Sequence, residues 1–399
     1  MSEWKTCKLS EIGEIVGGAT PSTKNPNFYD GEIPWITPKD LTNWSDMYIS
    51  KGERSITKAG YDSASCKMMP KGTVLFTSRA PIGYIAIAAN DVCTNQGFKS
   101  VVPNTDLIDS KFLYYSLIFN KNKIIAMGSG TTFAEISGKV MASVEISLPP
   151  LDIQKKIAAQ LSEIDDKIAV NKKICENLEA QAQTLFKHWF VDFAPFKDGK
   201  FIESELGLIP EGWRVGTLGE IAELRKPSIK PQDNILYTHY SIPAFDNNKK
   251  PSIDEGFTIK SNKFGINDGA VLLSKLNPTT KRIWYAGNVP DNSVSSTEFL
   301  PFYSKNQEFT PFIYCYLNCD SNYREIANGA KGTTNSHQRI DANSILNRAL
   351  AYSEETIRDF CDCCQYMMDL ILEANQESSR LATLRDTLLP KLMSGQIKL

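Results

Sequence analysis

The residues best suited to bind a metal are the cysteines. Cys361, Cys363 and Cys364 are close enough in sequence to suggest a small metal site. They lie in a long run without Gly or Pro that predicts a helix, on which the three sulfurs would point in different directions. Buried thiols behave as small hydrophobic side chains, so we interpret this group as core residues. The three histidines lie far apart and in no His-Glu-x-x-His context, which argues against a histidine-based metal site.

Motifs for phosphate binding, methyl transfer and hydrolysis are missing from the sequence. The segment 329–334, Gly-Ala-Lys-Gly-Thr-Thr, has the composition of a phosphate-binding loop but not its spacing. No Asn/Asp-Pro-Pro-Tyr tetrapeptide, expected of an amino-methyltransferase, and no Gly-x-Ser-x-Gly nucleophile motif occurs. The sequence therefore nominates no catalytic mechanism, and we expect neither a metal nor a cofactor bound to this chain.

Composition and charge limit the class of protein. The 399 residues are 42% hydrophobic and 23% charged, which excludes wholesale disorder and predicts two or three domains. A net charge of −2 argues against coating nucleic acid through bulk positive charge, although local basic patches remain possible. The longest apolar runs are too short to span a membrane, and the start of the sequence predicts no signal peptide. Nine cysteines at irregular spacing favour a reducing, cytoplasmic location.

The chain is an internal repeat with a long period. Five pairs of similar segments occur in the same order in both halves, at offsets between 197 and 209 residues. The pairs begin at Trp4 and Trp213, Lys71 and Asp268, Phe112 and Phe312, Gly130 and Gly332, and Leu178 and Leu381. This period is far longer than that of a solenoid repeat, so the sequence predicts two complete copies of one unit. Each copy has a mixed region of short β-rich runs and turns, followed by a long helix.

Both predicted helices carry a narrow apolar stripe. In the first, apolar or small residues recur every three or four positions from Ile157 to Leu185, with Asn171 filling one place in the stripe. The second stripe begins at Phe360 and slips toward its end, to Leu384 and Leu388. Such heptad spacing with polar flanks favours two helices that pair with each other, with Asn171 fixing the register. The alternative is that each helix packs on its own domain, which would make Asn171 a surface residue.

Eight segments of the chain, in order, resemble the specificity subunit of type I restriction–modification enzymes. They are Trp4-x4-Leu9-x-Glu11-Ile12, Pro34-Trp35-Ile36-Thr37, Thr77-Ser78-Arg79-Ala80-Pro81-Ile82-Gly83, Gly128-Ser129-Gly130-Thr131-Thr132-Phe133, Leu148-Pro149-Pro150-Leu151-x2-Gln154, Leu185-Phe186-Lys187-x-Trp189-Phe190-Val191-Asp192-Phe193, Leu206-Gly207-x-Ile209-Pro210-x-Gly212-Trp213 and Leu388-Leu389-Pro390-Lys391-Leu392-Met393-Ser394-Gly395. The second copy departs from the pattern at 274–278, where it lacks the Arg-Ala-Pro-Ile-Gly sequence, and before its helix, where it lacks Pro-Pro.

The resemblance implies an α+β fold with two similar mixed α/β target recognition domains, separated by two long helices that form an antiparallel coiled coil. Each domain would read one half of a bipartite double-stranded DNA target, and the coiled coil would set the gap. The subunit would be non-catalytic, and would dock two methyltransferase subunits and, through them, motor–nuclease subunits. S-adenosylmethionine, ATP and Mg would belong to those partners. The boundaries would be 1–148 and 207–352 for the two recognition domains, 149–190 and 353–390 for the helices, 191–206 for a connector and 391–399 for a tail.

Candidate DNA-contacting residues are polar or basic residues in loops near Gly and Pro. They are Lys24, Lys39, Ser78, Arg79, Thr131 and Thr132 in the first copy, and Lys275, Lys281, Arg282, Lys331, Thr333, Thr334, His337 and Arg339 in the second. Arg79 is the strongest, because it follows a β-rich run, lies in one of the resembling segments and can bond guanine with its forked guanidinium. Its structural alternative is a buried pair with a carboxylate.

Two other classes of function stay open on the sequence. One is a stand-alone sequence-specific nuclease or methylase with an unrecognised site, which metal-dependent cleavage by the purified chain would favour. The other is an interaction scaffold that binds no DNA.

Overall fold

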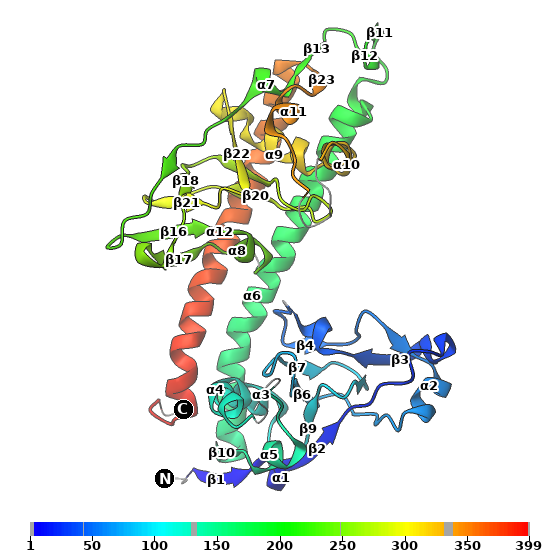
Figure 1. The fold of residues 1–399 in the computed structure, drawn as a ribbon, viewed down its shortest axis with the longest axis vertical. Helices are drawn as coiled ribbons and strands as arrows, with labels where there is room; N and C mark the ends of the chain where they lie inside the picture. The colour runs from blue at the N-terminus through cyan, green and yellow to red at the C-terminus, as the bar shows by residue number, and fades with distance from the viewer. Residues whose placement is uncertain (1–3, 43, 129–133, 248, 331–337, 398–399) are drawn as a thin grey trace. The chain divides into compact units, whose positions relative to one another are not determined.

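A computed structural model describes residues 4–42, 44–128, 134–247, 249–330 and 338–397. The chain divides into two compact units (Figure 1). Unit 1 consists of Met1–Asn171 and Glu377–Leu399, and unit 2 consists of Lys172–Gln376. Each unit therefore contains one mixed domain and a segment of each of the two long helices, α6 (Leu151–Phe186) and α12 (Glu354–Met393). In the described part of the chain, no helix is both long enough and apolar enough to cross a membrane.

The described residues of the mixed domain in unit 1 form three sheets. A strand pair joins the start of the domain to its end, β1 (Lys5–Lys8) with β10 (Glu145–Leu148). The central sheet has the order β2-β9-β6-β7-β4, formed by Gly13–Gly17, Lys99–Pro103, Val74–Phe76, Ile85–Ala88 and Tyr48–Ile49. The outer sheet has the order β5-β3-β8, formed by Ser55–Ile56, Tyr29–Ile36 and Cys93–Thr94. The helices are α1 (Leu9–Ile12), α2 (Lys58–Ser63), α3 (Ser110–Phe119), α4 (Lys121–Ala126) and α5 (Gly138–Ser143), with short turns η1 (Pro26–Phe28) and η2 (Pro38–Leu41).

Unit 2 repeats this plan. Its first and last strands pair, β13 (Arg214–Thr217) with β23 (Ala349–Tyr352). The inner sheet has the order β14-β22-β19-β20, formed by Ala222–Leu224, Phe299–Ser304, Ala270–Ser274 and Ile283–Ala286. The outer sheet has the order β15-β18-β21-β16-β17, formed by Ser228–Ile229, Lys263–Gly265, Ser293–Ser295, Leu236–Tyr240 and Ser252–Glu255. The helices are α7 (Leu218–Ile221), α8 (Ile242–Asp246), α9 (Thr310–Asn318), α10 (Asp320–Asn328) and α11 (Ala342–Leu346), with η5 (Gly256–Thr258) and η6 (Gln307–Phe309).

Between the two mixed domains, the chain forms η3 (Lys187–Val191), η4 (Ala194–Phe196) and the hairpin of β11 (Phe201–Ser204) and β12 (Gly207–Pro210).

The strand order confirms the internal repeat predicted from the sequence. The order β2-β9-β6-β7 in unit 1 is matched by β14-β22-β19-β20 in unit 2, and both domains are closed by an antiparallel pair of their first and last strands. Each outer sheet also contains one parallel pair, β3 with β8 and β16 with β21. Two copies of one fold therefore underlie the chain.

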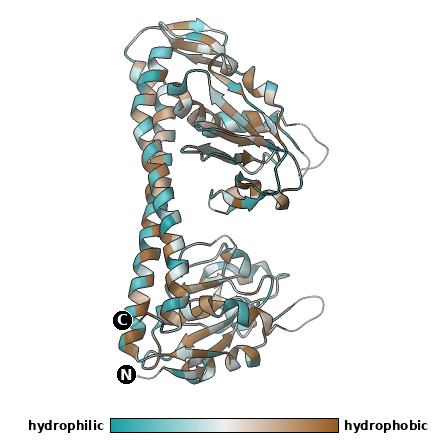
Figure 2. Ribbon diagram, turned by 90° about the vertical axis from the view of Figure 1, so that its left-hand side faces the viewer, coloured by the Kyte–Doolittle hydropathy of each residue, from teal (hydrophilic) through white to brown (hydrophobic). Residues whose placement is uncertain are grey.

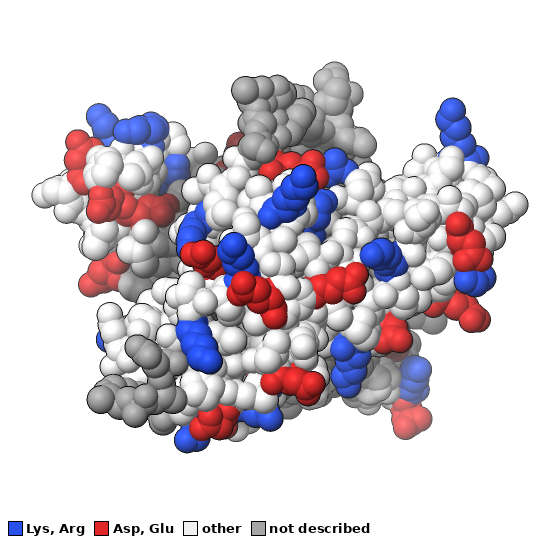
Figure 3. Space-filling view, turned by 90° about the horizontal axis from the view of Figure 1, so that it is seen from below, with Lys and Arg blue, Asp and Glu red and all other residues white. Residues whose placement is uncertain are grey.

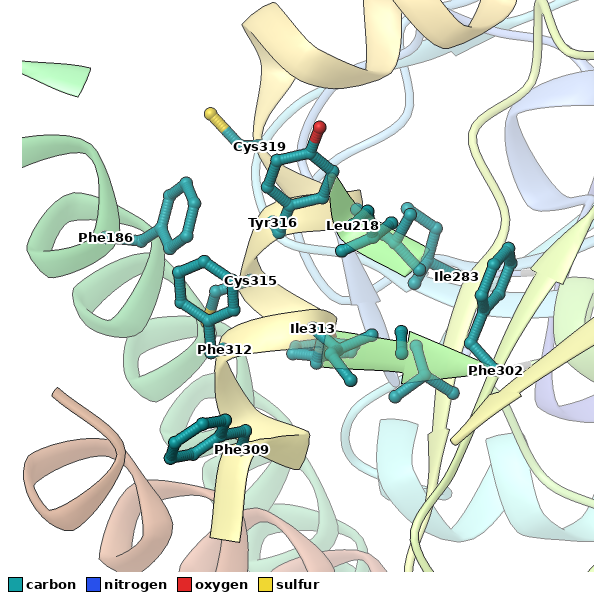
Figure 4. Packing of buried hydrophobic residues seen from close by; sticks show 14 of the residues in the cluster. Phe186, Leu218, Ile283, Phe302, Phe309, Phe312, Ile313, Cys315, Tyr316 and Cys319 are labelled. Carbon is teal, nitrogen blue, oxygen red and sulfur yellow. The ribbon is translucent and has the colours of Figure 1, made fainter. Parts of the chain in front are cut away.

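The central strands are buried on both faces, which explains their continuous apolar sequence. In β6, Val74 and Phe76 belong to the cluster shared with α3, whereas Leu75 faces the cluster shared with the outer strands. In unit 2 the corresponding division places α9 on one face of the inner sheet. Figure 4 shows Phe312 of α9 on the side of Phe186.

Within each unit α6 and α12 pack together and also pack on the mixed domain. In unit 1 the shared core includes Ile157 and Leu161 of α6 with Leu389 and Leu392 of α12. In unit 2, Cys175, Ala182 and Phe186 share a core with Phe360 and Cys364, among others. Figure 2 shows brown and teal residues alternating along both helices, as expected for helices with an apolar and a polar face. The two interpretations of the stripe, pairing and packing on a domain, are therefore both correct.

Contacts along the helix pair show an antiparallel arrangement. Asn171 is buried and donates from Nδ2 to Oε2 of Glu377 at 2.7 Å. Six residues earlier on α6, and in the same unit, Asp165 accepts from Nη1 of Arg385 at 2.7 Å. As residue numbers rise on α6 they fall on α12. Asn171 is thus an interhelical contact, as the pairing interpretation predicts, and not a surface residue.

At the end of the second stripe the prediction was wrong for Leu384 and is confirmed for Leu388, which packs against the core of unit 1. Leu384 is 47% exposed, and Arg385 takes the inward position, where its Nη1 donates to Oδ1 of Asp165 at 2.7 Å. The neighbouring Leu389 is buried as well, beside Pro390, which α12 contains in its last turn. An ion pair thus takes the place of an apolar contact at this one position, and apolar burial resumes at Leu388 and Leu389.

The cysteine interpretation is confirmed for the pair that shares the stripe. Cys361 and Cys364 are buried in the core of unit 2, while Cys363 is exposed. Among the described residues, no group of three potential ligands is placed to hold a metal ion.

Candidate nucleic-acid interface

Arg79 lies in the loop that follows the central strand β6. Its Nη1 is 3.8 Å from Oε2 of Glu135, and Nζ of Lys99 is 3.7 Å from Oε1 of the same carboxylate. One carboxylate is therefore shared by two cations, which leaves an excess of one positive charge at this point. The side chain of Arg79 is 38% exposed, so the pair is neither buried nor tight. Donors of the guanidinium remain available for a phosphate or a base edge.

If the chain reads a bipartite DNA target, as the resemblance implies, Arg79→Ala is expected to weaken binding to the first half-site and to leave the second unaffected. Loss of a bidentate base contact costs about 1–3 kcal/mol of binding free energy and relaxes specificity at one position. Titration of the assembled complex against duplexes mutated in one half-site at a time measures this effect. An equal loss on unrelated DNA would identify Arg79 as a phosphate contact instead.

Ser78 is the clearest correction among the candidate residues. Its side chain is fully buried, and its backbone N–H donates to the carbonyl of Gly97 at 2.7 Å. The Ser78 carbonyl in turn accepts from the N–H of Ile136 at 2.9 Å. The buried hydroxyl has no partner among the described residues. Ser78 therefore joins three segments of the domain and does not lie on its surface.

The same backbone junction recurs in unit 2 with different side chains. Lys275 takes the place of Ser78, since its N–H donates to the carbonyl of Glu298 at 2.9 Å and its carbonyl accepts from Ile340 at 3.0 Å. Arg339, beside Ile340, contacts Glu298 through Nε at 3.2 Å and Nη2 at 3.3 Å. The carboxylate and the cation have exchanged segments relative to unit 1. One scaffold thus presents two different charge patterns.

Lys281 and Arg282 are engaged by carboxylates of their own unit. Arg282 makes a bidentate contact with Asp246, at 2.7 and 2.9 Å, and only 13% of its side chain is exposed. Lys281 donates to Asp320 at 2.7 Å. The geometry of Arg282 is that of a structural ion pair, which argues against its predicted role at a DNA surface.

The other candidates are exposed, half-buried or outside the described residues. Lys24 is exposed, and Lys39 is exposed but donates to Glu53 at 2.7 Å, a hydrogen bond that raises the pKa of Lys39. Lys275 is half-buried. Thr131, Thr132, Lys331, Thr333, Thr334 and His337 fall outside the described residues.

Charges of both signs are interspersed on the face drawn in Figure 3. Blue Lys and Arg side chains there have red Asp and Glu side chains among them, without a broad block of either sign among the coloured residues. This pattern agrees with the near-neutral net charge and favours recognition through individual contacts over bulk attraction.

Sequence reasoning missed two carboxylates of α6 that anchor the mixed domains. In unit 1, Asp165 accepts from Oη of Tyr115 at 2.6 Å and from Arg385. Burial raises the pKa of Tyr115, and the neighbouring Asp165 raises it further, so the phenol remains a donor. In unit 2, Glu179 accepts from Tyr314 and from Lys249. The partners are between 50 and 220 residues apart in sequence, so no local pattern marks them.

Comparison with known proteins places the whole chain in one family. The family model described as the type I restriction modification DNA specificity domain matches residues 1–180 and 210–342. The chain is 37% identical over 417 residues to the MjaIX type I restriction enzyme specificity subunit of Methanocaldococcus jannaschii, covering 99% of this chain and 94% of that protein. The HindI specificity subunit of Haemophilus influenzae is 30% identical over 205 residues, covering 49% of this chain and 43% of that protein.

A solved structure shows the same fold. The S subunit of a type I restriction–modification system from M. genitalium superimposes with a TM-score of 0.56 at 17% sequence identity, covering 98% of this chain and 96% of that one. The match to a specificity subunit over nearly the full length, at 37% identity, and the matched domain model agree with the duplicated fold. The chain therefore belongs to the specificity subunits of type I restriction–modification systems.

Proposed function

We propose that this specificity subunit reads a bipartite DNA target, with residues 1–148 reading one half and residues 207–352 the other. The observation that carries the proposal is the repeated fold with charges exchanged between two segments of one junction. Lys99 and Glu135 pair there in unit 1, and Glu298 and Arg339 pair there in unit 2. The same backbone fold in both domains would let each contact the DNA phosphates in the same way. Different side chains at the same place would let each domain contact different bases.

The proposal assigns the gap between the half-sites to the helix pair. α6 has 36 residues, so it is about 54 Å long at 1.5 Å per residue. The helices would also dock two methyltransferase subunits and, through them, the motor–nuclease subunits. S-adenosylmethionine, ATP and Mg would act in those partners. Methyl transfer by the isolated chain would contradict this assignment and favour a stand-alone enzyme.

Exchange of one recognition domain tests the proposal. Replacing residues 1–148 by the corresponding domain of a relative should change one half of the methylated sequence and preserve the other. The boundary follows the fold, because β1 and β10 pair from Lys5 to Leu148 and close the domain. Methylation mapping of genomic DNA by the assembled complex provides the measurement.

The reciprocal exchange of residues 207–352 is the matched control, since β13 and β23 close the second domain in the same way. It should change the other half of the target. If either exchange altered both halves, or if neither altered any, modular reading of a bipartite target would be wrong.

A further inference from the structure

The carboxylate of Glu179 on α6 accepts hydrogen bonds from two side chains in different parts of unit 2. Nζ of Lys249 lies 2.8 Å from its Oε1 and 3.2 Å from its Oε2, and Oη of Tyr314 donates to Oε1 at 3.2 Å. Tyr314 is buried on α9, and Lys249 follows α8. About a third of each charged side chain is exposed, 28% for Glu179 and 36% for Lys249. The pair is therefore partly shielded from water.

The two layers of the second mixed domain meet the helices in different ways. We call the outer sheet with α8, residues 228–265 and 293–295, the outer lobe. The inner sheet and α9 share a continuous apolar core with α6 and α12. The outer lobe packs on the opposite face of the inner sheet through Tyr240, Ala244 and Trp284. Among the described residues, that apolar cluster contains none from α6 or α12. Apolar packing thus fixes the inner layer on the helices but not the outer lobe.

α8 is held from two sides. Arg282, which immediately precedes β20, donates two hydrogen bonds to Asp246 of α8. Three residues further on, Lys249 donates its backbone N–H to Phe245 at 2.9 Å and sends its ammonium group to Glu179. Figure 1 shows α8 beside α6. The outer lobe is in this way tied both to the inner sheet and to α6.

We propose that Glu179 and Lys249 form a strut that fixes the outer lobe of the second recognition domain on α6, and thereby makes the complex strict about the gap between its half-sites. This inference rests on the proposed bipartite function. A lobe released from α6 pivots on its apolar contacts with the inner sheet and carries its DNA contacts with it. Targets with a neighbouring gap length are then accepted more readily. Glu179 and Lys249 are positioning residues in this scheme.

Unit 1 is anchored differently. Its corresponding carboxylate on α6, Asp165, also accepts from a tyrosine of the domain but takes its cation, Arg385, from α12. The hydrogen bonds of Asp165 with Tyr115 and Arg385 therefore connect α6 and α12 to α3. They involve no residue of the outer sheet of unit 1. The strut therefore assigns gap discrimination to the second half-site.

The test is Lys249→Met in the assembled methyltransferase complex, assayed on duplexes with the native gap and with gaps one base pair shorter and longer. Ion pairs at this level of exposure contribute up to about 1 kcal/mol, which corresponds to about fivefold. We expect the rate ratio of non-native to native gaps to rise about fivefold. Lys250→Met is the matched control, since this neighbouring lysine is exposed and should leave the ratio unchanged. The double variant Glu179→Lys with Lys249→Glu restores the pair and should restore strictness.

Three outcomes overturn the strut. The first is a Lys249→Met complex that methylates a bipartite target with the wild-type gap profile. The second is a parallel fall in rate on all three duplexes, which identifies a purely structural role. The third is a charge-reversed pair that fails to restore the ratio although thermal unfolding shows an intact fold. A complex whose wild-type target is not bipartite overturns the proposed function instead.

Discussion

A heptad inserted after Asn171 in α6 together with a heptad inserted after Gln376 in α12 is expected to lengthen the gap in the DNA target by about three base pairs. Seven helical residues add about 10 Å, and duplex DNA rises about 3.4 Å per base pair. The two points face each other, because Asn171 contacts Glu377 and Cys175 contacts Ile371. Both half-site sequences should survive, since neither recognition domain is changed.

Methylation mapping of the doubly inserted complex measures the new gap. DNA twist must also be matched, so the gap can differ from three added pairs by one. The control is the same heptad in α6 alone, which moves one apolar stripe past the other and should abolish assembly. An active, stable complex that kept the original gap would show that these helices do not measure the DNA.

Phe186→Ala is expected to cost about 3–5 kcal/mol of unfolding free energy, the range for deleting a buried phenylalanine. Phe186 is 1% exposed at the end of α6. Its ring lies 5.2 Å from that of Phe190, 5.5 Å from Phe312 and 5.8 Å from Phe360, measured between centroids. The side chain therefore joins α6, α9 and α12 in one aromatic cluster, and its removal leaves a cavity shared by all three helices.

Thermal unfolding of unit 2 should then shift downward by about 10 °C, given about 2–4 °C per kcal/mol for a unit of this size. Tyr366→Ala supplies the control, because Tyr366 lies on α12 with 69% of its surface exposed and should change stability by at most about 0.5 kcal/mol. A shift for Phe186→Ala no larger than that of Tyr366→Ala would mean that the aromatic cluster does not hold the helices together.

The features predicted correctly from the sequence are those that periodicity and internal repetition determine. The apolar spacing located both long helices and the inward place of Asn171, and the paired segments located two copies of one fold. Periodicity failed at Leu384, because it counts apolar residues and cannot foresee that Arg385 finds Asp165 across the helix pair.

The candidate surface was harder to predict from the sequence. A polar residue in a loop suggests exposure, yet Ser78 is buried because its backbone joins three segments of the sheet. Arg282 is held by Asp246, which lies 36 residues earlier. Such pairings depend on tertiary contacts between distant segments, which one sequence without its structure does not contain.

The division of the chain into units has a consequence for biosynthesis. Unit 2 is one continuous segment, Lys172–Gln376, whereas unit 1 needs both Met1–Asn171 and Glu377–Leu399. At about 5–20 residues per second, a ribosome needs roughly 10–45 s to advance from Asn171 to Leu392. Throughout this time Ile157 and Leu161 lack their partners Leu389 and Leu392. The unit whose translation begins first is thus completed after unit 2, and α6 lacks these apolar partners until the last turns of α12 emerge.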